Sequence, residues 1–285
     1  MLEAYEIPQQ MKEIYRPEKS DYRFPVALEP AFDSRGNEVP KTKLVVRQDN
    51  FKVLSAVSDR YRLIPHERVV EPIKDFVRIL GRATAQYSVE RDGARLVVTH
   101  TFKDIGLELP GHKMPGQAKK GDVVALRTYA TNSYNTSTPF EFRFGAMVLR
   151  CLNGATAFDS LFGIKHRHIG NSFEDEIIFP KPEILVAAFH QQGDLWKAWA
   201  EKGFETRAQV AQIVEQGLKL QLMTRKAYQE KETYFTQADT VWDLYNAFTY
   251  VITHNEKIQE SGRISRFDRL NALFNQGFGQ EAQAS

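Results

Sequence analysis

The spacing of hydrophobic residues changes near residue 180, and the predicted secondary structure changes with it. Before this point apolar and polar residues alternate in short runs, which is typical of half-buried strands. After it apolar residues recur every three to four positions, as in amphipathic helices. Strands are predicted as two short runs within 43–57 and then at 84–90, 94–102, 122–131 and 140–150. Helices are predicted at 182–202, 206–231 and 237–256, with a fourth at 266–275.

One helix is expected among the strands, at residues 66–80, because its apolar residues recur at helical spacing. Arg91-Asp92-Gly93 stands between two predicted strands, and Asp-Gly is a strong signal for the tight turn of a hairpin. Residues 110–121 contain three Gly, two Pro and three Lys, which indicates an exposed loop. The polar run 132–139 is predicted to connect the last two strands.

Strands first and helices last predict an α+β fold. We expect a mainly antiparallel sheet body packed with helices, followed by a helical carboxy-terminal subdomain. The division of the chain is then an amino-terminal arm or set of loops at 1–40, an α+β body at 41–180, and a helical subdomain with a short polar tail at 181–285. Five prolines and poor periodicity suggest loops for the first of these segments.

The composition, with 42% hydrophobic and 26% charged residues, excludes a disordered chain. No run approaches the roughly 18–20 apolar residues that cross a bilayer, and the first residues resemble no signal peptide. We therefore expect no membrane partner and a cytoplasmic protein. The single cysteine, Cys151, cannot form an internal disulfide, and its apolar neighbours indicate a buried structural thiol.

The net charge is only +2, from 38 Lys and Arg against 36 Asp and Glu, which argues against a protein that coats duplex DNA. The basic excess is local, however. Between Lys41 and Arg68 seven basic residues stand against three acidic ones, and between His112 and His168 eight stand against three. After residue 180 the balance is slightly acidic, with twelve against thirteen.

The window from His112 to His168 also holds seven Tyr and Phe residues. Cations that meet phosphates, combined with exposed rings on which bases stack at ~1–3 kcal/mol each, are what single-stranded nucleic acid requires. Phe140, Phe142 and Phe144 alternate with polar residues and are expected in the core, so the tyrosines are the stacking candidates. The loop Lys113–Lys120 is expected to close over the strand. The predicted site for single-stranded DNA comprises Lys41, Lys43, Arg47, Arg60, Tyr61, Arg62, Lys113, Lys119, Lys120, Arg127, Tyr129, Tyr134, Arg143, Arg150, Lys165 and Arg167.

We expect no enzymatic activity, no catalytic residue and no cofactor, because phosphate-binding glycine loops, the dinucleotide fingerprint, HExxH and GxSxG are absent from the sequence. His166 and His168 would share one face of a strand and could approach a metal together. No carboxylate or cysteine stands nearby at ligand spacing, and the flanking Lys165 and Arg167 would repel a cation, so no metal site is predicted. A metal-dependent nuclease that uses these two histidines is the alternative from another class.

Five segments resemble, in their order along the chain, a phage/plasmid-like family of unknown function that is common on mobile elements. They are Val57–Glu67, the hairpin at Gly93–Arg95, Asn132–Ser137, Leu149–Gly154 and Lys165–His168. Together they cover roughly residues 45–170. The chain departs from the family pattern at Asn135-Thr136, where a glycine is usual. Within this family, the chain length and the added helices resemble the single-stranded-DNA-binding (Drc-type) RNA polymerase cofactors of schitoviruses.

The resemblance implies a phage protein in the host bacterial cytoplasm that coats single-stranded DNA. It further implies that the protein brings the phage RNA polymerase to promoters in middle transcription, self-associates on DNA, and has a fold unlike the oligonucleotide-binding barrel. We therefore expect a largely sequence-independent DNA-binding transcription cofactor. Two further hypotheses are a recombination mediator that anneals strands, and an interaction protein whose helices present Trp196, Trp199, Trp242, Tyr245 and Phe248 to a polymerase.

Overall fold

The computed structural model describes residues 22–113, 115, 121–148, 153–155, 164–168, 179 and 181–279. The predicted α+β fold is confirmed: the described residues form two antiparallel sheets and helices, and no closed barrel. The strands are β1 (Val26–Phe32), β2 (Glu38–Arg47), β3 (Val53–Ser58), β4 (Thr84–Glu90), β5 (Arg95–Leu109), β6 (Asp122–Ser133), β7 (Phe140–Val148), β8 (Asn153–Ala155) and β9 (Ile164–His166). The helices are α2 (His66–Leu80), α3 (Pro182–Glu201), α4 (Arg207–Lys219), α5 (Arg225–Glu230), α6 (Glu232–Thr236), α7 (Val241–Thr253) and α8 (Glu260–Phe278), with the 3-10 turn η1 at Arg91–Gly93.

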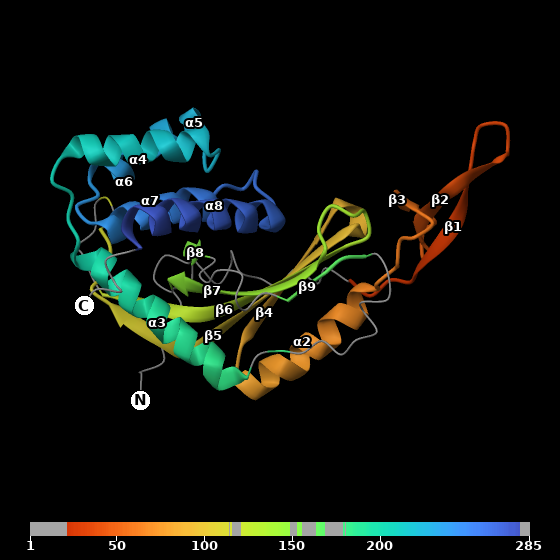
Figure 1. Cartoon of the computed structure of the whole chain (residues 1–285), viewed down its shortest axis with the longest axis horizontal. Coiled ribbons are helices and arrows are strands. Elements are labelled where there is room, and N and C mark those ends of the chain that lie inside the picture. Colours follow the sequence, from red (N-terminus) through yellow and green to blue (C-terminus); the bar gives the residue numbers. More distant parts are fainter. Residues whose placement is uncertain are drawn as a thin grey trace.

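The smaller sheet, in the order β1-β2-β3, forms an arm that projects from the body of the molecule (Figure 1). The sequence pattern predicted an arm or a set of loops up to residue 40. The structure instead has β1 and the beginning of β2 in this range. Pro30 fits because β1 is an edge strand, in which one backbone N–H need not join the ladder. The break around Gln48-Asp49-Asn50 is confirmed between β2 and β3.

The larger sheet has the order β4-β5-β6-β7-β8, and β9 pairs with β7. The hairpin predicted at Arg91-Asp92-Gly93 joins β4 to β5. On the face toward α2, Leu96, Leu126 and Phe142 are buried in the main core, as the pattern predicted for the phenylalanines of β7. The opposite face is more polar and includes Arg95, Arg127 and Arg143.

Figure 1 shows α2 and α3 on one side of the larger sheet and α7 and α8 on the other, with α4 and α5 over α7 and α8, away from the sheet. One hydrophobic core runs through these layers, so the described residues on both sides of residue 180 share it. Asp122 of β6 joins the layers, since it accepts hydrogen bonds from His112 Nδ1 at 2.6 Å and from Trp242 Nε1 at 3.1 Å. None of the helices in the described ranges is long and apolar enough to span a membrane.

Most predicted helices are confirmed, but the single helix at 206–231 is wrong. Thr206 is its N-cap as expected, with a capping box to Gln209. The chain then turns after Lys219, and Thr224 starts α5 by accepting a hydrogen bond from the Ala227 N–H. The turn brings Leu222 and Met223 into the core, and the burial of these apolar side chains favours the break.

The aromatic residues that were offered as a polymerase surface are buried. Trp196, Trp199, Trp242, Tyr245 and Phe248 all lie in the main core. Trp242 stacks on Tyr245, and Trp199 packs against the same tyrosine with 5.3 Å between ring centroids. Because these rings hold α3, α7 and α8 together, the expectation that they face a partner is wrong.

Candidate nucleic-acid interface

Four of the five segments that carry the family resemblance, Val57–Glu67, Gly93–Arg95, Asn132–Ser137 and Lys165–His168, meet where the arm joins the larger sheet. We call this place the junction and define it by Tyr61, His66, Asn132, Tyr134 and His168. Tyr61 comes from the segment after β3, His66 begins α2, Asn132 and Tyr134 lie at the end of β6, and His168 follows β9. All five are buried. Segments that are far apart in the sequence therefore come together at the junction.

The first half of the junction is a hydrogen-bonded pair of rings, Tyr134 and His66. The Tyr134 hydroxyl accepts the backbone N–H of His66 at 2.8 Å, and the ring centroids are 4.1 Å apart. His66 Nε2 donates to the Gly93 carbonyl at 3.0 Å, while Asn132 Nδ2 lies 2.9 Å from His66 Nδ1 and donates to Ile64. Burial lowers the pKa of His66 to about 4, so this imidazole is neutral at pH 7.

Gly93 is required at this point by both its backbone and its surroundings. Its φ of 103° lies in the left-handed region, and a Cβ there would come within 2.5 Å of the Phe24 ring. The Arg47 guanidinium lies 3.7 Å from the centroid of the same ring and donates to the Asp92 carbonyl. Arg47 also pairs with Asp49, so this predicted DNA contact anchors the arm to the sheet.

The second half of the junction joins the first basic stretch to the second. Tyr61 stacks on His168 with 5.3 Å between centroids and donates its hydroxyl to the Ser133 carbonyl at 3.1 Å. The Arg62 backbone N–H donates to the His168 carbonyl at 2.9 Å. The Asp59 N–H donates to the Lys41 carbonyl at 3.0 Å, which keeps β2 beside the same segment.

These contacts bring six of the predicted cations to the outside of the junction. Arg60, Lys41, Lys165 and Arg167 are exposed, and Lys43 and Arg62 are half-buried. We call them the junction cations: Lys41, Lys43, Arg60, Arg62, Lys165 and Arg167. The two basic stretches of the sequence thus meet along one part of the molecule, which their separation in the chain did not require.

Two other predicted arginines, Arg127 and Arg143, lie elsewhere, on the sheet face that α8 covers. Arg127 is buried, donates to Thr99 Oγ1 at 3.0 Å and lies 3.9 Å from a Glu260 oxygen. Arg143 pairs with Glu141 at 2.7 Å and with Asp268. As exposed phosphate contacts these two assignments are wrong, because carboxylates of α8 and of the sheet already pair with them.

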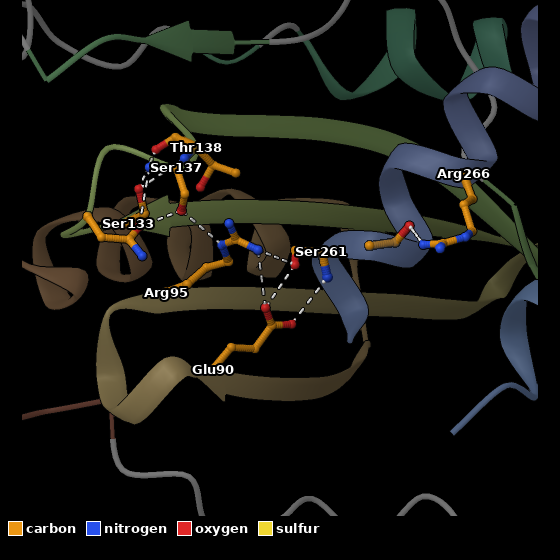
Figure 2. Close-up of polar contacts among 9 residues, drawn as sticks. Glu90, Arg95, Ser133, Ser137, Thr138, Ser261 and Arg266 are labelled. Atoms are coloured by element: carbon orange, nitrogen blue, oxygen red, sulfur yellow. Dashed lines mark hydrogen bonds and ion pairs between the residues drawn. The ribbon is translucent and has the colours of Figure 1, made fainter. Parts of the chain in front are cut away.

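Figure 2 shows the end of this interface, where Arg95 meets Glu90 and Ser261 of α8. Ser261 Oγ donates to Glu90 at 2.8 Å and accepts from Arg95 Nη1 at 2.5 Å, while Arg95 Nε donates to Ser137. A small apolar cluster of Val97, Tyr129 and Ile264 accompanies these polar contacts. Polar and charged groups therefore make up a large part of the contact at this end of α8.

The expectation that bases stack on tyrosines of the predicted site is wrong. The exposed fractions are 4% for Tyr61, 1% for Tyr129 and 0% for Tyr134. Burial raises the pKa of Tyr61 and of Tyr134, as it does for a phenol held away from water. Tyr61 and Tyr134 pack together in one hydrophobic cluster, and Tyr129 packs in another, so none of the three rings offers a face to a ligand.

Lys113, the first residue of the predicted closing loop, lies at the opposite end of β5 and β6 from the junction. The Lys113 N–H donates to Asp243 at 2.6 Å, and its ammonium lies 3.0 Å from Asp239, both at the start of α7. Lys113 therefore lies apart from the junction cations. Lys119, Lys120 and Arg150 lie outside the described residues, as does Cys151.

Two exposed aromatic rings on the arm were missed. Phe51, in the turn between β2 and β3, is 77% exposed, and Phe32, at the end of β1, is 60% exposed. Beside Phe51, Lys52 pairs with Asp92 at 2.7 Å. An apolar ring inside the polar turn Asp49-Asn50-Phe51-Lys52 was the available signal, since such a residue has no buried side to face.

The two histidines of the nuclease hypothesis have different neighbours. His166 stacks on Phe140 with 5.9 Å between centroids, whereas His168 stacks on Tyr61. Within the part of the chain that the structure describes, no group of three or more His, Cys, Asp or Glu residues is arranged to hold a metal ion.

Comparison with protein families gives one finding, a match of residues 53–274 to a domain of unknown function, DUF932. The match starts at the first residue of β3 and ends inside α8, so it includes the junction and the helical layer. Lys41 and Lys43 lie before it. No curated protein and no solved structure matches the chain.

Proposed function

The chain belongs to the DUF932 family, and we propose that it binds single-stranded DNA at the junction, largely without regard to base sequence. The observation that carries this proposal is the meeting of the six junction cations through the Arg62–His168 hydrogen bond and the Tyr61–His168 stack. Phosphates neutralised by such cations supply affinity that does not depend on sequence.

The exposed ring of Phe51 supports the preference for single strands. Bases of a single strand are free to stack on a protein ring, whereas those of a duplex are already stacked on one another. Phe51 lies at the base of the arm, and Phe32 lies at its far end. Both rings belong to the same small sheet as Lys41 and Lys43. The arm therefore offers cations and rings together, although the tyrosines do not.

The finer role rests on the resemblance to the Drc-type cofactors of schitoviruses. By that resemblance we propose that the protein acts in the host bacterial cytoplasm, self-associates on DNA and brings a phage RNA polymerase to promoters. The proposed role is one of binding, with no chemical step. Loss of middle transcription in a phage that carries a DNA-binding-deficient variant would test this role separately from DNA binding itself.

The direct test measures binding of labelled oligothymidine and of a matched duplex by fluorescence anisotropy across a salt series. If all six junction cations meet phosphate, the slope of log affinity against log salt is expected near −4, at about 0.7 per contact. Lys165→Ala with Arg167→Ala should reduce the magnitude of that slope by about 1.4. Phe51→Ala should weaken binding while leaving the slope unchanged.

The matched control is Lys181→Ala with Lys197→Ala, which removes the same charge from the N-cap of α3 and from α3 itself; Figure 1 shows this helix away from the arm. It is expected to leave the slope unchanged. Equal affinity for the single strand and the duplex would contradict the single-strand preference, and an affinity that does not depend on salt would contradict the phosphate contacts.

A further inference from the structure

The basic residues of the helical subdomain are concentrated around one groove. This groove has a volume of about 1160 Å³ and lies between α4, α5 and the turn from α7 to α8. Six of the twelve Lys and Arg residues after residue 180 line it, against three of the thirteen Asp and Glu residues. The six are Lys219, Arg225, Lys226, Lys231, Lys257 and Arg266. A slightly acidic part of the chain thus presents a locally basic surface.

Two of the three carboxylates in the groove are already paired inside it. Glu215 pairs with Arg225 at 3.2 Å, and Glu230 lies 4.0 Å from Lys226. Lys219 and Lys257 are exposed, and no ion pair within the described ranges joins either of them to a carboxylate. The groove therefore keeps an excess of positive charge at its rim that an anionic ligand could neutralise.

The floor of the groove is apolar. Met223 and Val251 are buried there, and the half-buried Ile258 and Leu218 extend the same surface. A volume of about 1160 Å³ exceeds the ~300–1000 Å³ of a typical small-molecule pocket. An apolar floor with a basic rim suits a ligand that is both extended and amphipathic, with apolar groups on one side and carboxylates on the other.

The aromatic side chain of the groove disfavours a nucleic acid. Tyr250 stacks on Tyr234 with 4.5 Å between centroids, and His254 lies 4.4 Å from the same ring. The Lys231 ammonium also lies 5.6 Å from its centroid. Because these contacts already occupy the ring, it offers no platform for a base, and single strands rely on such platforms.

We propose that this groove binds an acidic, amphipathic segment of a partner protein. The apolar side of the segment lies on the half-buried Leu218 and Ile258, and its carboxylates meet Lys219 and Lys257. Figure 1 shows α4 and α5 on the side of the helical layer away from the sheet, so a partner there leaves the junction accessible. The proposal does not depend on DNA binding.

The test uses the full chain and a fluorescein-labelled synthetic peptide of Glu and Leu that forms an amphipathic helix. Its counterpart with Gln in place of Glu is the peptide control. Lys219→Glu with Lys257→Glu should weaken binding of the Glu/Leu peptide about tenfold or more, because each change turns an attraction into a repulsion. Lys181→Glu with Lys197→Glu, which makes the same change of net charge on α3, should leave peptide binding unchanged. All four side chains are exposed, so the folded state is expected to persist in both variants.

Three results would overturn the proposal: no binding of the Glu/Leu peptide, equal binding of the Gln peptide, or equal losses in the two double variants. Oligothymidine is measured in parallel. If the groove variant loses affinity for oligothymidine but not for the peptide, the groove holds nucleic acid and the proposal is wrong. A wild-type chain that binds the peptide but not oligothymidine would contradict the function proposed for the junction and leave this one standing.

Discussion

The junction and the interface between α8 and the sheet hold their cations in opposite ways. At the junction the buried groups are uncharged rings and amides, such as Tyr134, His66 and Asn132, and the cations lie outside. Under α8, Arg127 and Arg143 are turned inward and meet carboxylates. Both regions appeared in the sequence as the same mixture of basic and aromatic residues.

The difference shows that local charge density does not reveal whether a cation is available. A basic residue is free for a ligand only if the fold brings no carboxylate to it. Arg143 lies on a central strand and receives Asp268 from α8, which is 125 residues away in the chain. Lys165 lies on β9, which pairs with β7, and its side chain is exposed. Whether a cation is covered thus depends in part on segments that are distant in the chain, as Asp268 is from Arg143.

The largest effect is expected from lowering the pH, which acts on the uncharged groups buried at the junction. Burial lowers the pKa of His66 at the junction to about 4, and it does the same for His100 on β5, outside the junction; both values lie below about 6.5, the value in the unfolded chain. As the pH falls below about 6.5, the unfolded state takes up protons that the folded state refuses, so stability decreases until about pH 4. The free energy of unfolding should fall by about 3 kcal/mol for each imidazole.

Chemical denaturation at several pH values measures this loss, and NMR titration of the imidazoles assigns it. His66 should remain neutral down to about pH 5 if the junction is built as described. Titration of His66 near pH 6.5 would mean that water reaches the junction. The interface between α8 and the sheet contributes to the loss in this range through Arg127, whose charge adds to burial and to Lys74 in lowering the pKa of His100.

The second-largest effect is expected from removing a charge at the interface between α8 and the sheet. Arg127→Ala removes a buried guanidinium and leaves Glu260 and Thr99 without it, which should lower the free energy of unfolding by about 3 kcal/mol. Lys165→Ala, the matched change at the junction, should alter stability by less than about 0.5 kcal/mol. Urea denaturation measures both variants. If Arg127→Ala reduces the magnitude of the salt slope for DNA binding while the protein stays folded, Arg127 contacts DNA after all.

The smallest effect is expected from removing one hydrogen bond inside the junction. Tyr134→Phe keeps the ring and its stack on His66 but removes the oxygen that accepts the His66 N–H. The loss of this buried hydrogen bond should cost about 1–2 kcal/mol. Because no charge is involved, the cost should be the same at low and at high salt, whereas the cost of Arg143→Ala, which breaks the more exposed ion pair with Asp268, should decrease with salt. Thermal denaturation at two salt concentrations distinguishes the two cases.

Local patterns predicted much of the secondary structure. The helix at 66–80 was located correctly because its apolar residues recur on one face and pack on the sheet, so that local and tertiary preferences agree. The helix at 206–231 was not, since the break at Leu220–Thr224 depends on the burial of Leu222 against α7 and other helices. The strand content before residue 40 was missed because an edge strand tolerates proline.

The candidate site was predicted only in part. The exposed cations Arg60 and Lys165 were identified from charge density and order along the chain. Tyr129 was chosen from the same density, but strand alternation places it against Ile264 of α8, a contact that no local pattern contains. Phe51 was overlooked because a single apolar residue in a turn carries little periodic signal.

The sequence by itself determined the α+β class, the change from strands to helices near residue 180, and the two basic stretches. These properties depend on residue type and on spacing within a few turns or strands. Only the tertiary structure decided that the two stretches meet at the junction, that α8 neutralises Arg127 and Arg143, and that the predicted tyrosines are buried. Burial and charge pairing depend on contacts between distant segments, and these exist only once the chain has folded.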